Sequence, residues 1–408
     1  MAHVPSRIRY VMGTPTERVL AESATRPAAP PDVLHVVPTA LGRGAQVFAR
    51  ALVDELGGER TGHRLVSLFD GHSDIVVDVA LGLPGGAGTV GGLQPKAVAR
   101  LSRELHRMAP AMVVAHGGDA FKYVALATRA PIAYCVIGTW PAAAHRGLLR
   151  LLWRALIRRA WVAAAVSDDV AADCRAVLGV PDDRLVVIPN GRDAQHYRPV
   201  ERSESAGPHD VTLLFVGRLD AGKRPDRFVE AVRTLRADGL EVTGKILGDG
   251  PMRGKLEEPA ARSGVELLGW CADIVPHLQV ADVLVFPSAP DGEGMPGVLI
   301  EAGLCGVPAV ATCVAGASTV IEHGTTGLLV PIDDLDALVG ALADLARDAG
   351  RRRAMGKAAR ARCEAAFTLP VVAASWHRLL QLGLTPVGRG TRHPRAADLA
   401  ALRATGPR

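Results

Sequence analysis

The sequence has few aromatic residues, no paired cysteines and no long apolar run. Aromatic residues make up 4% of its 408 residues, and so few rings disfavour a platform for stacking single-stranded nucleic acid. No apolar run reaches the roughly 18–20 residues needed to span a bilayer, and the first thirty residues lack the apolar segment of a signal peptide. The cysteines show neither CxxC nor zinc spacing, which favours reduced structural thiols in a cytoplasmic protein: Cys135, Cys174, Cys271, Cys305, Cys313 and Cys363.

The charge is concentrated at the two ends of the chain. Residues 1–31 contain four arginines against two glutamates, and residues 386–408 contain five arginines against one aspartate. These ends carry net charges of +2 and +4, which leaves −1 of the total of +5 for residues 32–385. A nearly neutral body argues against a nucleic-acid partner. We expect residues 1–31 to be a disordered leader and residues 386–408 a disordered basic tail, because both are rich in arginine and proline.

Strand-like runs alternate with helical patterns along the body of the chain. The first four predicted strands are "DVLHVV", "AMVVAH", "AWVAAAVS" and "RLVVIPNG", and the polar linker "PVERSESAGPHD" follows them. Six more follow the linker: "VTLLFVG", "EVTGKILGDG", "GVELLGW", "ADVLVFPS", "VPAVAT" and "GLLVP". This alternation predicts an α/β protein with two parallel-sheet domains, at residues 32–200 and 209–367. Ligands of such sheets bind beyond the carboxyl ends of the strands.

One loop matches a phosphate-binding motif only in part. "GRLDAGK" (217–223) follows a predicted strand and fits G-x-x-x-x-G-K, but Arg224 and Pro225 stand where a P-loop needs Ser or Thr to ligate magnesium. A P-loop nucleoside triphosphatase is therefore disfavoured. Arg218 and Lys223, beside a helix N-terminus, are suited to a bound phosphate; the alternative is two ordinary surface cations, and this loop alone does not decide between them.

Two glutamates lie close together in "DGEGMPGVLIEAGLCG" (291–306). Glu293 falls in a glycine-rich loop, and Glu301 falls about one turn into an otherwise apolar helix. The helical neighbours of Glu301 cannot pair with a carboxylate, and a buried ion without a partner costs several kcal/mol. Glu301 therefore needs either a ligand or a basic residue from a neighbouring element.

Several motifs together resemble those of retaining nucleotide-sugar glycosyltransferases of family four, which have the GT-B fold. The C-terminal half carries "VGRLDAGKRPDRFVEAV", "ILGDGP", "LLGW", "FPSAPDGEGMPGVLIEAGLCGVPAVAT" and "TTGLLVP" in order. The N-terminal half agrees more loosely, through "GRGAQ", "MVVAHGG", "AVSDDVAADC" and "IPNGRDAQHYRP". The resemblance covers residues 32–385. It implies two Rossmann-like domains, the first on the acceptor side and the second binding the nucleotide-sugar donor, with a helix at 368–385 that crosses back onto the first domain.

The resemblance also implies roles for particular residues. Those near the reaction are His116, Arg218, Lys223 and Glu293, with Glu293 addressing the donor sugar and the two cations the diphosphate. Those binding the donor are Gly42, Gly44, Trp270, Gly294, Met295, Pro296, Gly297, Val298 and Glu301, the last through the ribose hydroxyls. Backbone N–H groups of 294–297 suit diphosphate and sugar oxygens. Two departures stand out, because the family usually has Pro-Glu at Ser318-Thr319 and often Glu at Gln46.

We expect a retaining transferase that moves a hexose-type sugar from a nucleoside-diphosphate sugar to a hydroxyl acceptor, small or lipid-linked, without a metal or other cofactor. The alternative is a non-catalytic nucleotide-sugar binding or regulatory protein. A helical stripe of Arg146, Arg150, Arg154 and Arg158 could place this cytoplasmic protein on the inner face of a membrane; the alternative is an ordinary solvated arginine face.

Overall fold

The computed structural model describes residues 32–42, 44–71, 73–83, 93–140, 147–200, 210–290, 293–384 and Leu399. The expected leader lies outside these residues, as does the expected tail apart from Leu399. By its internal contacts the chain divides into two units, Met1–Ala133 and Tyr134–Arg408, and each is described by itself.

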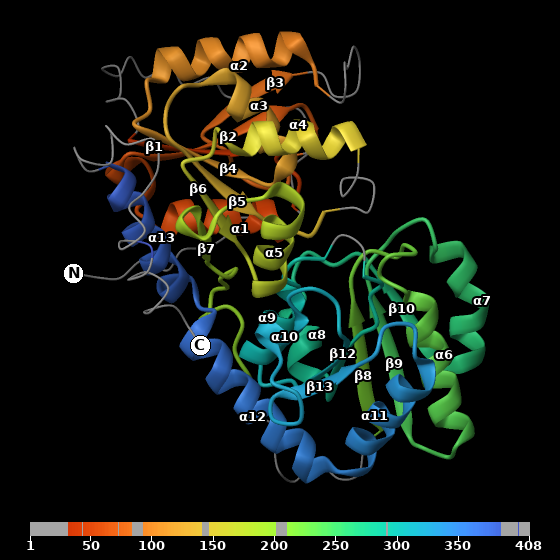
Figure 1. Ribbon diagram of the computed structural model, residues 1–408. Coiled ribbons are helices and arrows are strands. Elements are labelled where there is room, and N and C mark those ends of the chain that lie inside the picture. Colours follow the sequence, from red (N-terminus) through yellow and green to blue (C-terminus); the bar gives the residue numbers. More distant parts are fainter. Residues whose placement is uncertain are drawn as a thin grey trace, which may run out of the picture. The chain divides into compact units, whose positions relative to one another are not determined.

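The first sheet has seven strands in the order β3-β2-β1-β4-β5-β6-β7 (Figure 1). Its strands are β1 Val33–Val37, β2 His63–Phe69, β3 Val79–Leu83, β4 Met112–His116, β5 Ile132–Val136, β6 Val162–Ala165 and β7 Leu185–Val187. Its helices are α1 Gly44–Glu55, α2 Pro95–Met108, α3 Gly118–Ala127, α4 Gly147–Ile157 and α5 Asp168–Asp173, with shorter turns η1 Gly58–Thr61, η3 Cys174–Leu178 and η4 Asp182–Arg184. Every residue of β1, β4 and β5 is buried, as expected for strands of a parallel sheet covered on both faces.

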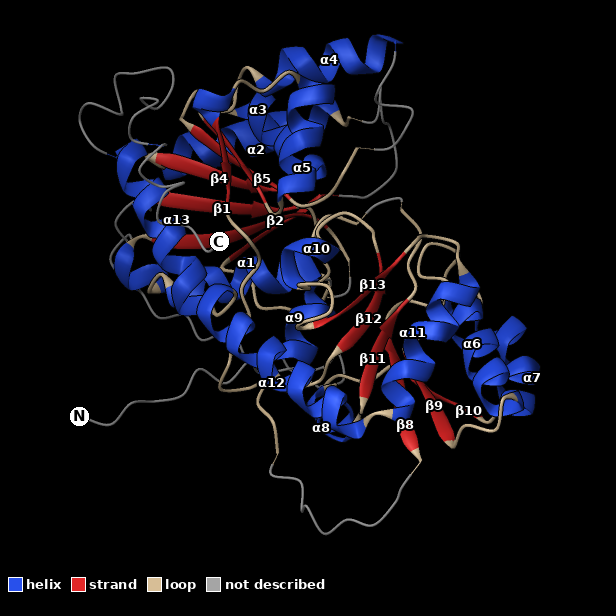
Figure 2. Ribbon diagram, turned by 60° about the horizontal axis from the view of Figure 1, so that its bottom comes forward, coloured by secondary structure: helices blue, strands red, loops and turns tan. Residues whose placement is uncertain are grey.

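The second sheet has six strands in the order β10-β9-β8-β11-β12-β13. Its strands are β8 Val211–Val216, β9 Val242–Leu247, β10 Val265–Gly269, β11 Val283–Phe286, β12 Ala309–Thr312 and β13 Gly327–Val330. Its helices are α6 Pro225–Ala237, α7 Arg253–Ser263, α8 Val275–Val280, α9 Gly297–Leu304, α10 Ala317–Val320, α11 Leu335–Arg347, α12 Ala349–Ala366 and α13 Leu369–Leu384. Figure 2 shows α6, α7 and α11 on one face of this sheet and α8, α9 and α12 on the other.

Both sheets confirm the predicted α/β class and the two Rossmann-like domains. Each strand predicted from the sequence contains an observed strand, shortened by one or more residues at its ends. Strands β2, β3 and β5 were not predicted, although the apolar run of β5, "IAYCV", carries the signal of a buried strand. Strand β3 is partly exposed and carries Gly82 at φ 57°, so its pattern is weak.

The strand order reverses between β1 and β4 in the first sheet and between β8 and β11 in the second. Such a reversal is the point at which open parallel sheets bind ligands, because the loops leaving the two strands diverge there. In the second sheet these loops are 217–224 and 287–296, of which 291–292 lie outside the described residues. They carry Lys223 and Glu293.

Strand pairing and internal contacts place the boundary between the two domains at different residues. The two sheets are separated by the segment after β7, whereas internal contacts divide the chain between Ala133 and Tyr134. The reason is that loops after β5 and β7 contact the second sheet's loops: the Thr139 N–H donates to the carbonyl of Glu293, and Arg192 pairs with Glu301. The predicted bounds 32–200 and 209–367 remain a prediction. The helix expected at 368–385 is α13, and its packing on the first domain also remains a prediction.

Candidate active site

The loop after β8 is held against the loop after β9 by backbone contacts. The N–H of Gly217 donates to the Leu247 carbonyl over 3.0 Å, and the N–H of Leu219 donates to the Asp249 carbonyl over 3.0 Å. A side chain at Gly248 would collide with the Gly217 carbonyl, and its φ of 142° also requires glycine. The "LGDG" segment after β9 therefore packs closely against the loop of Arg218 and Lys223 and holds the backbone of that loop in place.

Lys223 and Glu293 form an ion pair at the carboxyl edge of the second sheet. The Lys223 ammonium donates to Oε1 of Glu293, and it also lies 5.2 Å from the centre of the Phe286 ring. The two side chains are 30% and 12% exposed. The N–H of Ala289 donates to the Gly222 carbonyl over 2.8 Å, which joins the two loops directly. Two predicted site residues, 70 positions apart in the chain, are therefore brought together.

Arg218 lies in the same loop but outside this pair. Its side chain is 59% exposed, and its Nε lies 3.3 Å from Oδ2 of Asp220. The exposed guanidinium is therefore held at the loop by a partly exposed carboxylate, and solvent screens the interaction. A bound anion could compete with Asp220 for it.

The same loop does not have the contacts of a phosphate-cradling P-loop. The backbone N–H of Lys223 donates to Oδ1 of Asp220 over 3.1 Å, so it is used within the loop. Arg224 caps α6 at φ 52° and pairs with Asp333, where a P-loop would place a magnesium-binding hydroxyl. The structure agrees with the sequence in disfavouring a P-loop enzyme.

Glu301 is paired with an arginine from far along the chain. Nε of Arg192 donates to Oε1 of Glu301 over 2.5 Å, and the side chains are 8% and 12% exposed. Nη1 of Arg192 also donates to the Gly191 carbonyl over 3.0 Å. A basic residue of a neighbouring element, the alternative considered from the sequence, therefore satisfies Glu301. A carboxylate has about four acceptor positions, so this contact leaves Glu301 able to accept hydroxyl hydrogen bonds as well.

The segment between the two glutamates is more enclosed than expected. Gly294, Met295 and Pro296 are buried, and only Gly297 and Val298 are partly exposed. Pro296 has no N–H, so the expectation that all of 294–297 present backbone donors is wrong at that position. Gly297 begins α9, and a side chain there would collide with the guanidinium of Arg192. The N–H groups of Gly297 and Val298, at the first turn of α9, are the best placed to meet an anion.

Trp270 lies apart from this group. It follows β10, which is two strands away from β8 in the sheet, and its side chain is 69% exposed. Its expected contact with the donor remains a prediction.

Three expected residues belong to the first unit. His116 ends β4, is 2% exposed, and contacts Nδ1 of His35 through its Nε2 over 3.1 Å. Burial lowers the pKa of His116 to about 3, so this imidazole is neutral near pH 7. The N–H of Gly42 donates to Oδ2 of Asp74 over 2.8 Å, so a carboxylate already holds the donor that we expected a phosphate to meet. Gly44 is exposed and begins α1.

Two arginines of helix α4 bond to backbone carbonyls of the protein, which corrects the predicted solvent-facing stripe of four arginines. Arg150 donates to the carbonyls of Ala176 and Val177 over 2.8 and 3.2 Å, and Arg154 donates to Val177 over 3.1 Å. Ala176 and Val177 lie near the C-terminal end of η3. Carbonyls at a helix C-terminus carry partial negative charge, so arginine side chains are favourable partners there. Arg158 is exposed, and Arg146 lies outside the described residues. The exposed face of α4 consists instead of Leu148, Leu149, Leu151 and Leu152, which are 71%, 44%, 62% and 57% exposed.

The described part of the chain has neither a cluster of metal ligands nor a membrane span. Within the described residues no group of three or more His, Cys, Asp or Glu side chains could hold a metal ion. No helix in that part of the chain is long and apolar enough to cross a bilayer. The expectation that no cofactor or metal is needed remains a prediction.

Sequence reasoning missed three residues of these sites: Arg192, His35 and His63. Arg192 follows "IPNG" and carries the only charge in "LVVIPNGR", which was the available signal. His35 lies in the middle of the predicted strand "DVLHVV", where an imidazole in an apolar run indicates a buried partner. His63 begins a strand that was not predicted.

Comparisons with known proteins agree with this geometry. One curated relative is a D-inositol 3-phosphate glycosyltransferase of Kribbella flavida, 30% identical over 48% of this chain and 50% of its own length. Another is an Escherichia coli UDP-Gal:α-D-GlcNAc-diphosphoundecaprenol α-1,3-galactosyltransferase, 29% identical over 43% of this chain and 48% of its own length. The chain thus spans about half the length of these curated relatives.

Solved structures share the fold over most of the chain. Anabaena HepE in complex with UDP and glucose matches with a TM-score of 0.72 and 21% identity, over 86% of this chain and 99% of that chain. The family described as Glycosyltransferase Family 4 matches residues 42–196, and the one described as Glycosyl transferases group 1 matches residues 210–348. These two matches include both switch-point loops of the second sheet and β4 with His116. The chain therefore belongs to the family-four type of glycosyltransferases and has the GT-B fold.

Proposed function

We propose that this protein is a retaining glycosyltransferase that moves a hexose-type sugar from a nucleoside-diphosphate sugar to a hydroxyl acceptor. The observation that carries the proposal is the ion pair of Lys223 and Glu293, from the two loops at the switch point of the second sheet. A cation and a carboxylate side by side there suit a substrate in which a diphosphate is joined to a sugar. The likeness to HepE, whose crystal structure is a complex with UDP and glucose, supports the proposal.

Each charged group of the site suits a particular part of the nucleotide-sugar donor. The Lys223 ammonium and the partly exposed Arg218 guanidinium would meet the diphosphate. Glu293 would then release Lys223 and accept hydrogen bonds from sugar hydroxyls, and Glu301 would accept from the ribose hydroxyls while Arg192 holds its other contact. The N–H groups at the start of α9 would add to the diphosphate site.

The proposed mechanism follows from the leaving group. Breaking the bond between the sugar and the diphosphate places negative charge on a phosphate oxygen and positive character on the sugar ring. Lys223 stabilises that developing charge electrostatically, and positioned charges are usually the largest contribution to such catalysis. We propose that the acceptor hydroxyl bonds to the anomeric carbon on the face from which the diphosphate departs and gives its proton to the departing phosphate, so that the configuration is retained without a protein nucleophile. His116, neutral near pH 7, would serve as a hydrogen-bond partner of the sugar rather than as a cation.

We also propose that the acceptor is lipid-linked and that α4 meets an anionic membrane surface. Four exposed leucines on one short helix form an apolar face that could enter the boundary of head groups and acyl chains. Exposed Arg158 at the end of the helix supplies charge for lipid phosphates, and Arg150 and Arg154 lie beneath. The curated galactosyltransferase relative, named for a diphosphoundecaprenol acceptor, supports this choice.

A thermal-shift panel of UDP, GDP, ADP and their sugars tests the proposed function. We expect one nucleoside diphosphate to raise the melting temperature, and its sugar to be transferred or slowly hydrolysed. Stabilisation by a nucleotide with no turnover of any sugar would favour the alternative, a non-catalytic nucleotide-sugar binding protein. No stabilisation by any nucleotide of the panel would refute both.

A further inference from the structure

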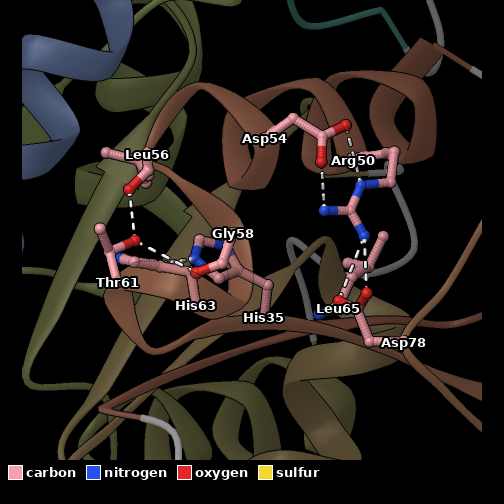
Figure 3. A network of polar contacts seen from close by, with 9 residues as sticks. All are labelled: His35, Arg50, Asp54, Leu56, Gly58, Thr61, His63, Leu65 and Asp78. Carbon is pink, nitrogen blue, oxygen red and sulfur yellow. Dashed lines mark hydrogen bonds and ion pairs between the residues drawn. The ribbon is translucent and has the colours of Figure 1, made fainter. Parts of the chain in front are cut away.

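Three histidines form a hydrogen-bonded row inside the first unit. Nδ1 of His35 lies 3.1 Å from Nε2 of His116, and Nε2 of His35 lies 3.2 Å from Nδ1 of His63. Figure 3 shows the His35 and His63 rings beneath α1, where Arg50 bridges Asp54 and Asp78. All three imidazoles are buried, with exposed fractions of 0%, 7% and 2% for His35, His63 and His116.

Strand register explains why the three rings meet. His35 pairs with Leu65 of β2 and with Val114 of β4. Side chains alternate between the two faces of a sheet, so His63 and His116 lie on the same face as His35. His63 begins β2 and His116 ends β4, so the row crosses the sheet diagonally and ends at the carboxyl edge, the edge where parallel sheets bind ligands.

Several of the residues around the row are apolar. Val37 and Leu65, on the same face, pack with Ala49 and Val53 of α1. Aliphatic side chains would fill such a layer without needing hydrogen-bond partners, whereas a buried imidazole must find them. The packing therefore does not require histidine at the position of His35.

The row is not arranged as a metal site. His63 and His116 contact opposite nitrogens of His35, so the three rings do not converge on one point. Within the described residues no cluster suited to a metal ion includes them. The contacts are hydrogen bonds between rings.

Burial also decides the charge of these rings. It lowers the pKa of His116 to about 3 and, together with the neighbouring His116, His63 and Arg50, lowers the pKa of His35 well below its ordinary value. Both rings are therefore neutral near pH 7. A neutral imidazole has one N–H donor and one acceptor nitrogen.

Neutral rings in this geometry can donate only in one direction along the row. If His116 donates from Nε2, then His35 must carry its proton on Nε2 and donate to Nδ1 of His63, which leaves the His63 proton on Nε2. If His63 donates from Nδ1, the protons of all three rings lie on Nδ1. The two contacts therefore allow either three Nε2–H rings or three Nδ1–H rings, and no mixture.

We propose that His35 and His63 are positioning residues that couple the tautomer of His116 to their own, so that the three rings change tautomer only together. This inference rests on the proposed function, in which His116 meets the sugar. In the Nε2–H arrangement His116 offers Nδ1 as an acceptor, and in the Nδ1–H arrangement it offers a donor. The tautomer of His63, at the far end of the row, is thus linked to whether His116 offers a hydroxyl an acceptor or a donor.

Nitrogen-15 NMR of histidine-labelled protein at pH 7 tests the inference without any substrate. The ring nitrogen shifts should give one common tautomer for His35, His63 and His116. A mixture of tautomers among the three would overturn the proposal. His323 provides an internal reference, because its Nδ1 accepts from the Leu329 N–H over 3.0 Å and the ring should be the Nε2–H form when it is neutral.

His35→Leu and His63→Leu then test the coupling. In His35→Leu, the His116 signals should move from a single tautomer toward an average of both, with His323 unchanged. His63→Leu keeps the contact of His35 with His116 and removes only the far end, so His35 and His116 should still share one tautomer. A folded His35→Leu variant in which His116 keeps its original tautomer, or a folded His63→Leu variant in which His35 and His116 differ in tautomer, would overturn the proposal.

Kinetics separate positioning from a merely structural role. His35→Leu should lower kcat about tenfold, the rate equivalent of one hydrogen bond, while the affinity for the nucleoside diphosphate stays within about twofold because the nucleotide is assigned to the second sheet. His106→Leu, an exposed histidine on α2, is the matched control and should change neither value. An unchanged kcat in His35→Leu would contradict the role. If the three rings share one tautomer but the protein turns over no sugar, the proposed function is wrong while the coupling of the three rings stands.

Discussion

Arg192 donates from Nε to Oε1 of Glu301 across 2.5 Å, although 109 positions separate the two residues in the chain. Both side chains are nearly buried, and the Arg192 backbone is also fixed, because its N–H donates to the Phe367 carbonyl over 2.9 Å. Glu301, which we propose to bind the ribose, is thus held by a residue from outside the second sheet.

Arg192→Met should destabilise the protein far more than the double variant Arg192→Met/Glu301→Leu. Removing one partner of a buried pair leaves an uncompensated charge and costs about 3–5 kcal/mol, whereas replacing both by apolar residues is often nearly neutral. Urea denaturation measures both. The exposed pair of Arg262 and Glu258 on α7 is the control, and its removal should cost less than about 1 kcal/mol. Additive losses in the Arg192–Glu301 cycle would contradict the coupling.

Glu301→Ala and Glu293→Ala should affect different steps. Glu301→Ala should weaken binding of the bare nucleoside diphosphate by about tenfold, the value of a hydrogen bond to a charged group. Glu293→Ala should lower turnover without lowering that affinity, because it frees Lys223 for the diphosphate. Calorimetry with the nucleotide and initial rates with the sugar measure the two effects. Equal losses of nucleotide affinity in both variants would refute this division of labour.

Lys223→Ala should lower turnover by roughly 10²–10³, the usual cost of removing one preorganised group that stabilises transition-state charge. Arg218→Ala should have a smaller effect, because its side chain is 59% exposed and screened by solvent. A chelator should leave most of the transfer activity, and added magnesium should restore little in Lys223→Ala. Lys255→Ala, at an exposed lysine of α7, is the control. Chelator-sensitive ATP hydrolysis that is abolished by Lys223→Ala would refute the glycosyltransferase assignment.

The histidine row should make the protein less stable in acid. Burial lowers the pKa of folded His116 from 6.5 to about 3, so between these values the unfolded chain binds one more proton than the folded one. The free energy of unfolding should therefore fall by up to about 1.4 kcal/mol for each pH unit below about 6.5 from this group, and His35 acts in the same direction. The titration of His116 therefore leaves the free energy of unfolding unaffected above about pH 6.5, and it lowers that free energy progressively as the pH is lowered toward 3.

Urea denaturation between pH 7 and pH 4 measures this slope. His116→Leu should lower this slope by up to about 1.4 kcal/mol per pH unit, the contribution of one proton. This holds whatever the effect of the substitution on stability at pH 7. His106→Leu, at an exposed histidine of α2, is the matched control. A slope that is the same in wild type and His116→Leu would show that His116 is not buried neutral.

The exposed leucines of α4 should carry any binding to anionic vesicles. Burying a leucine side chain contributes about 1.5–3 kcal/mol, so Leu151→Glu/Leu152→Glu should weaken sedimentation with phosphatidylglycerol vesicles at least about tenfold. Leu126→Glu on α3, where the leucine is 52% exposed, is the matched control. Wild-type protein that does not sediment with these vesicles, or an equal loss in Leu126→Glu, would refute the membrane surface.

The sequence by itself determined the strands and the loops that follow them. Continuous apolar runs such as "AMVVAH" and "ADVLVFPS" stand out because strands buried on both faces need apolar residues at every position. The same patterns place Lys223 and Glu293 at strand ends. The motif "LGDG" by itself indicates only a resemblance, and the structure shows why Gly248 is glycine: a Cβ there would collide with the Gly217 carbonyl.

Tertiary structure alone decided which of these residues meet. Lys223 reaches Glu293 because β8 and β11 are neighbours at the point where the strand order reverses, an order that no local pattern encodes. Arg150 and Arg154 donate hydrogen bonds to backbone carbonyls of η3. They therefore do not form the solvent-facing stripe that their spacing predicted. The row of His63, His35 and His116 likewise depends on the register of three strands. Periodicity fixes the side of an element on which a residue lies, but only strand order and register bring distant side chains within hydrogen-bonding distance.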